Sequence, residues 1–168
     1  MNKKVRIGVI GCGGIANGKH MPAESRNPEA ELVAFCDIIE ERAIKAREDF
    51  GKPEHKVYTD YRELLKDKSI DAVLVLTPNC AHCEITVAAL NAGKHVMCEK
   101  PMAMNYAEAK KMLEARDKSG KVLTIGYQNR FRPDSLYMKE RAAEGMFGDI
   151  YYAEAIAIRR RAVPRWGV

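Results

Sequence analysis

Short apolar runs alternate along this chain with longer segments in which apolar residues recur every three or four positions. The runs occupy residues 5–10, 32–36, 71–76, 94–98 and 122–126, with a shorter one near 57–58. An apolar run of this length between turn signals is typical of a strand covered on both faces. The pattern therefore predicts six strands, most of them in one parallel sheet.

The segments between these runs have the period and the end signals of helices. Ala43, Ala46 and Phe50 lie on one face of the segment after the second run, and Gly51 supplies a stop. Further helices are expected from about 14 to 22, around 64–65, around 85–92, between 105 and 120, and from about 133 to 144. The first of these should turn Ile15 and Ala16 toward the sheet.

Several helix ends carry recognisable sequence signals. Pro22 is expected to end or kink the first helix, because proline has no N–H to donate. Asp60 and Glu63 resemble a capping box, in which each residue satisfies a backbone N–H of the other. Asn105 followed by Glu108 predicts the start of the helix that ends before residue 120, and Ala109, Met112, Leu113 and Arg116 are expected to share one face of it.

An alternation of strands and helices of this kind predicts an α/β fold, a Rossmann-type doubly wound sheet with helices on both faces. Ligands of such sheets bind beyond the carboxyl ends of the strands. Five loops fall there, at Gly11, at Asp37 and at residues 77–79, 99–101 and 127–129. We therefore expect these loops to converge on one crevice.

The pattern changes after residue 126. Ile150, Tyr152, Ile156 and Ile158 alternate with smaller or polar positions, which predicts one long strand of period two. We expect residues 1–126 to form the nucleotide-binding domain, and residues 127–168 to form a connecting helix and the first strand and loop of a truncated α+β domain. The alternative is that this strand completes the first sheet and that the tail is natural.

Composition and charge limit the class of protein to which this chain can belong. The 168 residues are 46% hydrophobic and 30% charged, as in an ordinary globular domain with one core. A net charge of +5 could suggest a nucleic-acid partner. However, basic and acidic residues are interleaved at 40–42 and 45–49, which favours solvated helix faces and attraction for an anionic cofactor. We expect no nucleic-acid partner.

Cysteine usage and the ends of the chain indicate a compartment. Five cysteines without a secretory spacing pattern are typical of reduced thiols, so we expect a cytoplasmic protein. The N-terminus runs directly into the first strand, which leaves no room for a signal peptide. No apolar stretch approaches the roughly 20 residues of a membrane helix, and we expect no membrane partner.

The turn after the first strand has the spacing of a dinucleotide-binding loop. Gly11 allows a tight turn, Gly13 lets the backbone approach a pyrophosphate, and the small Ala16 lets helix and strand pack closely. Free backbone N–H groups of the turn, with the positive end of the helix dipole, would then face the phosphates, and Cys12, Gly14 and Ile15 are expected to contact the cofactor with the two glycines. A plain glycine-rich connection between strand and helix is the alternative.

Asp37 strengthens the dinucleotide interpretation and bears on which dinucleotide is bound. It ends the second run about 20 residues beyond the glycines, where an acid accepts hydrogen bonds from an adenosine ribose. A carboxylate there repels a 2′-phosphate, and Ile38 and Ile39 follow it in place of an arginine, so NAD is favoured. Arg42 lies close enough in sequence to pair with a 2′-phosphate, so NADP is the alternative cofactor.

Cys80 and Cys83 form a C-x-x-C motif, which could indicate dithiol or metal chemistry. No second ligand pair stands at the spacing of a zinc site, and a single C-x-x-C is a frequent accident. We therefore assign no metal to this chain.

With these loops placed, the sequence resembles the Gfo/Idh/MocA family, the oxidoreductases named for glucose–fructose oxidoreductase, inositol dehydrogenase and a rhizopine-catabolism protein. The motifs that carry the resemblance span nearly the whole chain. They are Gly11-Cys12-Gly13-Gly14-Ile15-Ala16, Thr77-Pro78-Asn79 with His82, Gly93-Lys94-His95-Val96 before Glu99-Lys100-Pro101, and Gly126-Tyr127-Gln128-Asn129-Arg130-Phe131-Arg132-Pro133. The resemblance implies an NAD(P)-binding domain followed by a sheet domain that supplies much of the substrate site and the usual catalytic Asp and His.

The resemblance also implies roles for residues of this chain. Lys100 becomes the catalytic candidate and a substrate contact, because a lysine partly buried beside the positively charged nicotinamide would have a lowered pKa and could relay a proton at neutral pH. Glu99 is expected to meet the nicotinamide or its ribose, and the bond before Pro101 is expected to be cis. Without the resemblance, Lys100-Pro101 reads as a surface turn.

Further contacts are implied along the cofactor. Thr77, Pro78 and Asn79 are expected to line it between pyrophosphate and nicotinamide, with Asn79 also capping the next helix. Gln128 is expected to contact the cofactor and Asn129 the substrate. His82 shares a helix face with apolar residues, so a packed histidine and a cofactor contact stay equally open.

The function that these observations favour is hydride transfer between NAD(P) and a sugar, an inositol or a related polyol. The resemblance implies that the full-length protein is a homo-oligomer, and that this chain alone binds cofactor with little activity. Three alternatives stay open: an NAD-binding regulatory or scaffold subunit without catalysis, imine reduction, and redox-assisted glycoside cleavage.

Overall fold

The computed structural model describes residues 3–158 and 160. The chain divides into two compact units, Met1–Gly126 and Tyr127–Val168.

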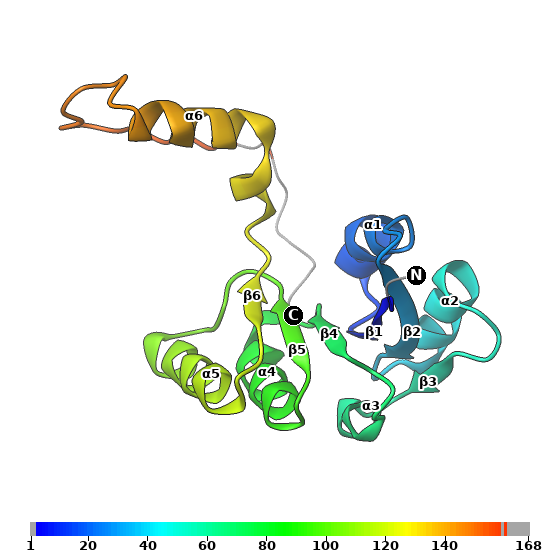
Figure 1. Cartoon of the computed structure of the whole chain (residues 1–168). Helices are drawn as coiled ribbons and strands as arrows, with labels where there is room; N and C mark the ends of the chain where they lie inside the picture. Colours follow the sequence, from blue (N-terminus) through cyan, green and yellow to red (C-terminus); the bar gives the residue numbers. More distant parts are fainter. Residues whose placement is uncertain (1–2, 159, 161–168) are drawn as a thin grey trace. The chain divides into compact units, whose positions relative to one another are not determined.

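The first unit is built on one six-stranded sheet in which all neighbouring strands are parallel (Figure 1). The spatial order is β3-β2-β1-β4-β5-β6, so the order reverses between β1 and β4. The strands are β1 (Val5–Ile10), β2 (Ala30–Cys36), β3 (Lys56–Tyr58), β4 (Ala72–Val75), β5 (His95–Cys98) and β6 (Leu123–Ile125). This arrangement confirms the predicted doubly wound parallel sheet.

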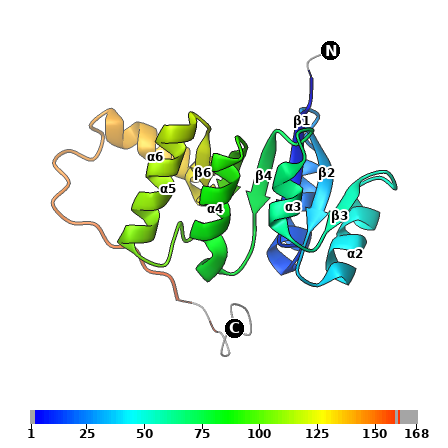
Figure 2. The same ribbon diagram turned by 90° about the horizontal axis from the view of Figure 1, so that it is seen from below.

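Helices connect the strands in the predicted alternation. In the first unit they are the π turn η1 (Ala16–His20), α1 (Met21–Glu24), α2 (Glu40–Phe50), α3 (Tyr61–Lys66), the 3-10 turn η2 (Asn79–Ala81), α4 (His82–Asn91) and α5 (Tyr106–Ser119). Helices α4 and α5 lie side by side (Figure 2). Asn105 caps α5 by accepting the N–H of Glu108, and Gly120 ends it with a φ of 66°.

Both faces of the sheet are covered, and the strands alternate between two cores. On one face Val73 and Val75 of β4 pack in a cluster with residues of α3, α4 and α5. On the other face Leu74 and Leu76 pack in a cluster with residues of η1, α1 and α2. Because both faces of each central strand are buried, apolar residues are favoured at every position of the strand. The apolar runs in the sequence are therefore continuous rather than alternating.

The structure corrects two expectations at helix ends. Asp60 accepts the N–H of Arg62, whereas the side chain of Glu63 pairs with Lys66, so the reciprocal capping box does not form. The first helix does not end at Pro22, because this residue lies in the first turn of α1. A π turn precedes it, and the N–H of Met21 reaches back to Ala16, which widens the helix just before the proline.

Two expectations about buried faces are also wrong. Ala16 is fully buried, but the side chain of Ile15 is 41% exposed, because the widened turn directs only one of the two residues into the core. Leu113 is 41% exposed on α5, where Met112 and Ala115 form the buried face instead. With 3.6 residues per turn, Met112 and Ala115 lie about 60° apart around the helix axis, whereas Leu113 lies about 160° from Ala115.

The second unit contains η3 (Gln128–Phe131) and α6 (Pro133–Ala143), which confirms the expected helix. The strand predicted at 150–158 is wrong: these residues form no regular element and their side chains are exposed. A period of two assigns faces, but a strand also needs a partner for its N–H and C=O groups, and the described residues provide none there. The loop expected after this strand falls mostly on residues 159 and 161–168, which lie outside the described residues.

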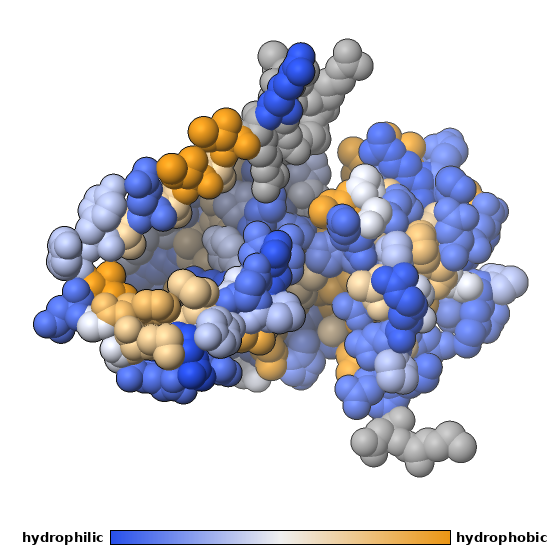
Figure 3. All heavy atoms as spheres, turned by 90° about the horizontal axis from the view of Figure 1, so that it is seen from above, coloured by the Kyte–Doolittle hydropathy of each residue, from blue (hydrophilic) through white to orange (hydrophobic). Residues whose placement is uncertain are grey.

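The surface agrees with the expectation of solvated charges. In Figure 3 the region on the right, which carries α1 and α2, is covered mainly by hydrophilic residues. Among the described residues, no helix is both long enough and apolar enough to cross a membrane.

Candidate functional site

The glycine-rich turn after β1 is held tightly on one side and open on the other. Gly11 has a φ of 95°, and a Cβ there would lie 2.7 Å from the carbonyl oxygen of Leu76. Only glycine fits a left-handed conformation at such a close approach. Gly13, by contrast, has no atom within 4 Å of the position of a Cβ. The turn therefore presents bare backbone to one side.

Asn17 and Asp37 hold this turn in place. The Nδ2 of Asn17 donates to the carbonyl oxygens of Cys12 at 2.7 Å and of Gly13 at 2.9 Å. The Oδ2 of Asp37 accepts the N–H of Cys12 at 2.9 Å, and its Oδ1 accepts the N–H of Ile39 at 2.9 Å. An ionised carboxylate has about four acceptor positions, so Asp37 keeps capacity for a further donor. The end of β2 is thereby joined to the turn.

Donors stay unused where an anion would approach. Within the described part of the chain, the N–H groups of Gly13 and Gly14 donate to no other group of the protein. They stand at the start of the helical segment that begins with η1, where free N–H groups and the helix dipole favour negative charge. Ile15 borders this open side. The turn has the properties of a phosphate cradle.

Cys12 contributes packing rather than reactivity. Its side chain is 2% exposed, and its Sγ lies 3.6 Å from the carbonyl oxygen of Cys36. Burial, with the nearby charge of Asp37, raises the pKa of the Cys12 thiol to about 12. Burial likewise raises the pKa of Cys36 to about 12. Both thiols are protonated at neutral pH, so neither is a nucleophile.

The loop after β4 lies against the same turn. The N–H of Leu76 donates to the carbonyl of Ile10, and the Oγ1 of Thr77 is buried without a hydrogen-bond partner among the described residues. A buried hydroxyl without a partner is costly unless a ligand or water satisfies it. Pro78 and Asn79 follow in this loop. The side chain of Asn79 caps neither η2 nor α4, so that part of the expectation is wrong.

His82 is a packed residue that joins two loops. Its ring has no exposed surface, and its Nδ1 lies 2.7 Å from the carbonyl oxygen of Pro101 while its Nε2 lies 3.0 Å from that of Thr77. Of the two alternatives, the structure thus favours the packed histidine, which fixes the loops after β4 and β5 relative to each other. A direct contact with a cofactor would require the ring to leave both carbonyls.

The loop after β5 carries the catalytic candidate. Glu99 is 5% exposed, and its Oε2 accepts the N–H of Lys100 at 2.9 Å. The peptide bond between Lys100 and Pro101 is cis, as expected. The Lys100 side chain is exposed rather than partly buried, so this part of the expectation is wrong. It forms no hydrogen bond or ion pair with the described residues.

Sequence reasoning missed His20. Its Nε2 lies 2.7 Å from the Oε1 of Glu99, so the π turn after the glycines and the end of β5 are in direct contact. No periodic or spacing signal marks this residue, because the two positions are 79 residues apart and meet only through the strand order. Four of the five predicted loops are thus brought together.

The fifth loop belongs to the other unit. Gln128 and Asn129 lie in η3 of the second unit, where both are exposed. Their expected contacts with cofactor and substrate stay predictions.

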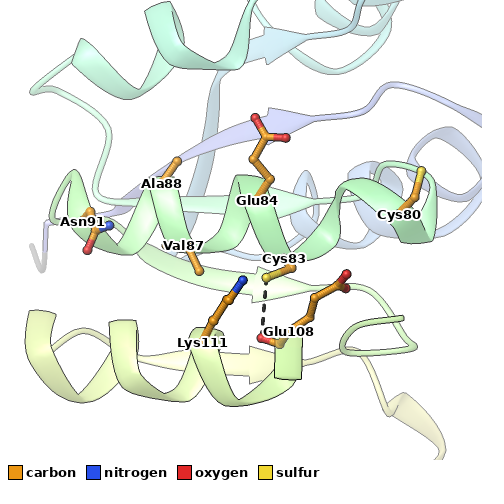
Figure 4. A pocket seen from close by; sticks show the side chains of 8 residues that line it. All are labelled: Cys80, Cys83, Glu84, Val87, Ala88, Asn91, Glu108 and Lys111. Atoms are coloured by element: carbon orange, nitrogen blue, oxygen red, sulfur yellow. Dashed lines mark hydrogen bonds between the residues drawn. The ribbon is translucent and has the colours of Figure 1, made fainter. Parts of the chain in front are cut away.

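The C-x-x-C motif lies in a different place, in an open groove of about 480 Å³ between α4 and α5 (Figure 4). Cys80 is exposed there, while the Sγ of Cys83 donates to the carbonyl oxygen of Glu108 at 3.5 Å. Burial raises the pKa of Cys83, which disfavours a reactive thiolate. Among the residues that the structure describes, no three His, Cys, Asp or Glu side chains are placed to hold a metal ion.

These features together fit a dinucleotide. The open backbone at Gly13, the unused N–H groups of the turn and the unpartnered Oγ1 of Thr77 lie at the carboxyl edge where the strand order reverses. This edge is the usual ligand position of open α/β sheets. Asp37 stands at one end of the set, and Glu99 with Lys100 at the other.

Comparisons with known proteins agree with this geometry. Residues 5–127 match a family described as "Oxidoreductase family, NAD-binding Rossmann fold". The chain is 38% identical over 164 residues to D-glucoside 3-dehydrogenase of Escherichia coli, which covers 98% of this chain and 46% of that protein. It is 36% identical over 144 residues to myo-inositol 2-dehydrogenase of Thermotoga maritima, covering 86% and 42%.

Solved structures are similar as well. The WlbA dehydrogenase from Bordetella pertussis in complex with NADH and UDP-GlcNAcA is 31% identical with a TM-score of 0.83, and the match covers 90% of this chain and 43% of that one. The 3-ketoreductase KijD10 from Actinomadura kijaniata in complex with NADP is 30% identical with a TM-score of 0.79, covering 88% and 46%. The chain spans less than half the length of each of these four proteins.

Proposed function

Because this chain belongs to the Gfo/Idh/MocA oxidoreductase family with its NAD-binding Rossmann fold, we propose that it is the cofactor-binding part of a dehydrogenase acting on a sugar, an inositol or a related polyol. The substrate class rests on relatives whose names include a D-glucoside and a myo-inositol dehydrogenase. The dinucleotide lies across the turn at Gly13, with its adenosine at Asp37 and its nicotinamide at Lys100.

One observation carries the proposal: the carboxylate of Asp37 is bonded to the N–H of Cys12, inside a turn whose next residue presents open backbone. The acid that would bind a ribose and the backbone that would bind a pyrophosphate are therefore parts of one rigid unit. A plain connection between strand and helix has no need of a nearly buried acid at that place.

The surroundings of Asp37 favour NAD over NADP. Ile38 follows it with 90% of its side chain exposed, and Ile39 is 39% exposed. Neither can neutralise a 2′-phosphate, and the carboxylate repels one. The structural relatives were solved with NADH in one case and with NADP in another. Arg42, in the first turn of α2, is close enough in sequence to serve NADP.

The chemical step needs few groups from this chain. When bound, the nicotinamide supplies the hydride acceptor at its C4. Lys100 hydrogen-bonds the substrate hydroxyl and takes up or relays its proton, because an alcohol that loses hydride must also lose that proton. Glu99 holds the backbone of Lys100, and His82 holds the loops on either side.

The opposite wall of the substrate site lies outside the first unit. We expect this chain to bind cofactor and to turn over polyols poorly by itself, since it spans less than half the length of its relatives. Gln128 and Asn129 of the second unit are assigned to the cofactor and substrate sides respectively. The complete enzyme is expected to form homo-oligomers.

Titration of the chain with NADH, followed by a scan of polyols, tests the proposal. NADH should bind with a measurable heat, and hydride transfer, read from the absorbance of reduced nicotinamide, should appear only when the chain is joined to a substrate domain. Absence of heat with both nicotinamide nucleotides would exclude the cofactor role. Binding without any change of absorbance in the joined protein would favour a regulatory subunit instead.

A further inference from the structure

His20 and Glu99 connect the two halves of the sheet at the candidate site. His20 ends η1, which follows β1, and Glu99 directly follows β5. Their side chains are only 17% and 7% exposed, with Nε2 and Oε1 2.7 Å apart. Because β4 lies between β1 and β5 in the sheet, the contact joins loops on either side of β4, beside the point where the strand order reverses.

Glu99 is held on three sides. Its Oε1 meets the ring of His20, and its Oε2 accepts the N–H of Lys100. On the third side a Cβ at position 126 would lie 3.2 Å from Oε1, so a side chain there would press on this carboxylate and displace it by a few tenths of an ångström. Each of the two carboxylate oxygens thus has a partner, and the carboxylate cannot rotate without losing one of them.

We propose that His20 is a positioning residue for the nicotinamide end of the dinucleotide site. Its ring orients Glu99, and Glu99 in turn fixes the backbone from which Lys100 projects. A nearly buried carboxylate that lost the imidazole would turn toward another donor or admit water, because an unsatisfied charge is costly. Glu99, which is expected to meet the nicotinamide or its ribose, would then lose its fixed position, and so would the backbone of Lys100. The inference rests on the proposed cofactor function and assigns a role to a residue outside the recognised motifs.

The adenosine end is held by other groups. Asp37, Cys12 and Asn17 bond to one another or to the turn, and none of these hydrogen bonds involves His20 or Glu99. Loss of the His20 ring should therefore weaken the nicotinamide end selectively. A purely structural role of His20 would weaken both ends together.

The test compares two ligands that differ in the nicotinamide. ADP-ribose contains the adenosine, pyrophosphate and second ribose of NADH but no nicotinamide. Both are titrated calorimetrically into the wild-type chain, His20→Leu and His20→Gln. We expect His20→Leu to weaken the binding of NADH about tenfold, as for loss of one hydrogen bond to a charged group. The binding of ADP-ribose should weaken by less than about twofold. His20→Gln, whose amide can donate to the same carboxylate, should recover most of the NADH affinity.

The outcomes separate the inference from the function on which it rests. If His20→Leu weakens the binding of both ligands equally, or leaves the NADH affinity unchanged, the positioning role is overturned. The cofactor function stays intact in either case. A wild-type chain that binds neither ligand would overturn both. If His20→Leu does not fold, His20→Asn repeats the comparison, because its amide is too short to reach Glu99 but keeps a polar side chain.

Discussion

The Oδ2 of Asp37 accepts the backbone N–H of Cys12 at 2.9 Å, which joins the end of β2 to the middle of the glycine-rich turn. The two residues are 25 positions apart, and the bond is buried. Because β1 and β2 are parallel neighbours and Ile10 lies opposite Cys36, their ends arrive together. The acid assigned to the ribose and the backbone assigned to the pyrophosphate therefore cannot move independently.

Cofactor preference follows from the neighbour of this acid. Calorimetry should show tighter binding of NADH than of NADPH, and Ile38→Arg should reduce that difference about tenfold by pairing a 2′-phosphate. Ile38 is 90% exposed, so the change should leave the fold intact. Val122→Arg, at a residue 60% exposed and outside the site, controls for the added charge. An NADPH preference in the wild type would contradict the assignment.

Two glycines of the turn should respond differently to alanine. Gly11→Ala should lower the free energy of unfolding by about 2–4 kcal/mol, because it combines a positive φ with a clash against the Leu76 carbonyl. Gly13→Ala should unfold like the wild type, because no atom lies within 4 Å, and yet lose NADH affinity where the pyrophosphate approaches. Thermal unfolding measures the stability of each variant, and NADH titration measures its affinity for the cofactor. The expectation fails if Gly13→Ala binds NADH normally.

Lys100 should matter for turnover more than for binding. In the chain joined to a substrate domain, Lys100→Met should lower kcat about 10²–10⁴-fold, the usual contribution of a proton-transferring group. NADH affinity should change little, because the side chain is exposed and bonds to no described residue. Lys19→Met, an exposed lysine of η1, is the matched control. Full activity of Lys100→Met would remove this residue from the mechanism.

The cysteines should separate by reactivity. Burial raises the pKa of Cys12 and of Cys36 to about 12 and that of Cys98 to about 11, so these thiols are protonated near pH 8. Iodoacetamide should therefore modify the exposed Cys80 first, as peptide mass spectrometry can show. In urea all five cysteines should react. Early modification of Cys12 in the folded chain would mean that the turn opens.

Asp67 should make stability depend on pH. Its carboxylate accepts from Lys56 at 2.7 Å and from the N–H of Ser69 at 2.9 Å, and these bonds hold its pKa well below the usual range. The stabilisation is present above about pH 4 and is lost as the pH falls through the lowered folded-state pKa.

Urea unfolding tests this dependence. At pH 7 Asp67→Asn should lower the free energy of unfolding by about 1–2 kcal/mol, and the difference from the wild type should narrow below about pH 4. Glu63→Gln, which removes an exposed ion pair with Lys66, should change stability by less than about 1 kcal/mol. A gap that is constant with pH would show that the Asp67 charge is not responsible.

The sequence alone was sufficient for the sheet, the helices and the glycine-rich turn. Residues such as Val73, Gly11 and Asn105 carry their reasons locally: burial on both faces, a positive φ and a helix cap. It was not sufficient at 150–158, because alternation describes the faces of a strand but not the presence of a partner. Nor could it decide which of Ile15 and Ala16 is buried, since a π turn leaves no periodic signal.

Tertiary structure decided what the polar residues at the carboxyl edge do. The sequence left His82 between a packed role and a ligand contact, and the fold placed two carbonyl oxygens at its ring nitrogens. It also brought His20 to Glu99 across 79 residues. Local patterns reflect interactions between neighbours in sequence, whereas these contacts depend on the spatial order of the strands in the sheet. That order determines which loop ends meet, and so which side chains can act together.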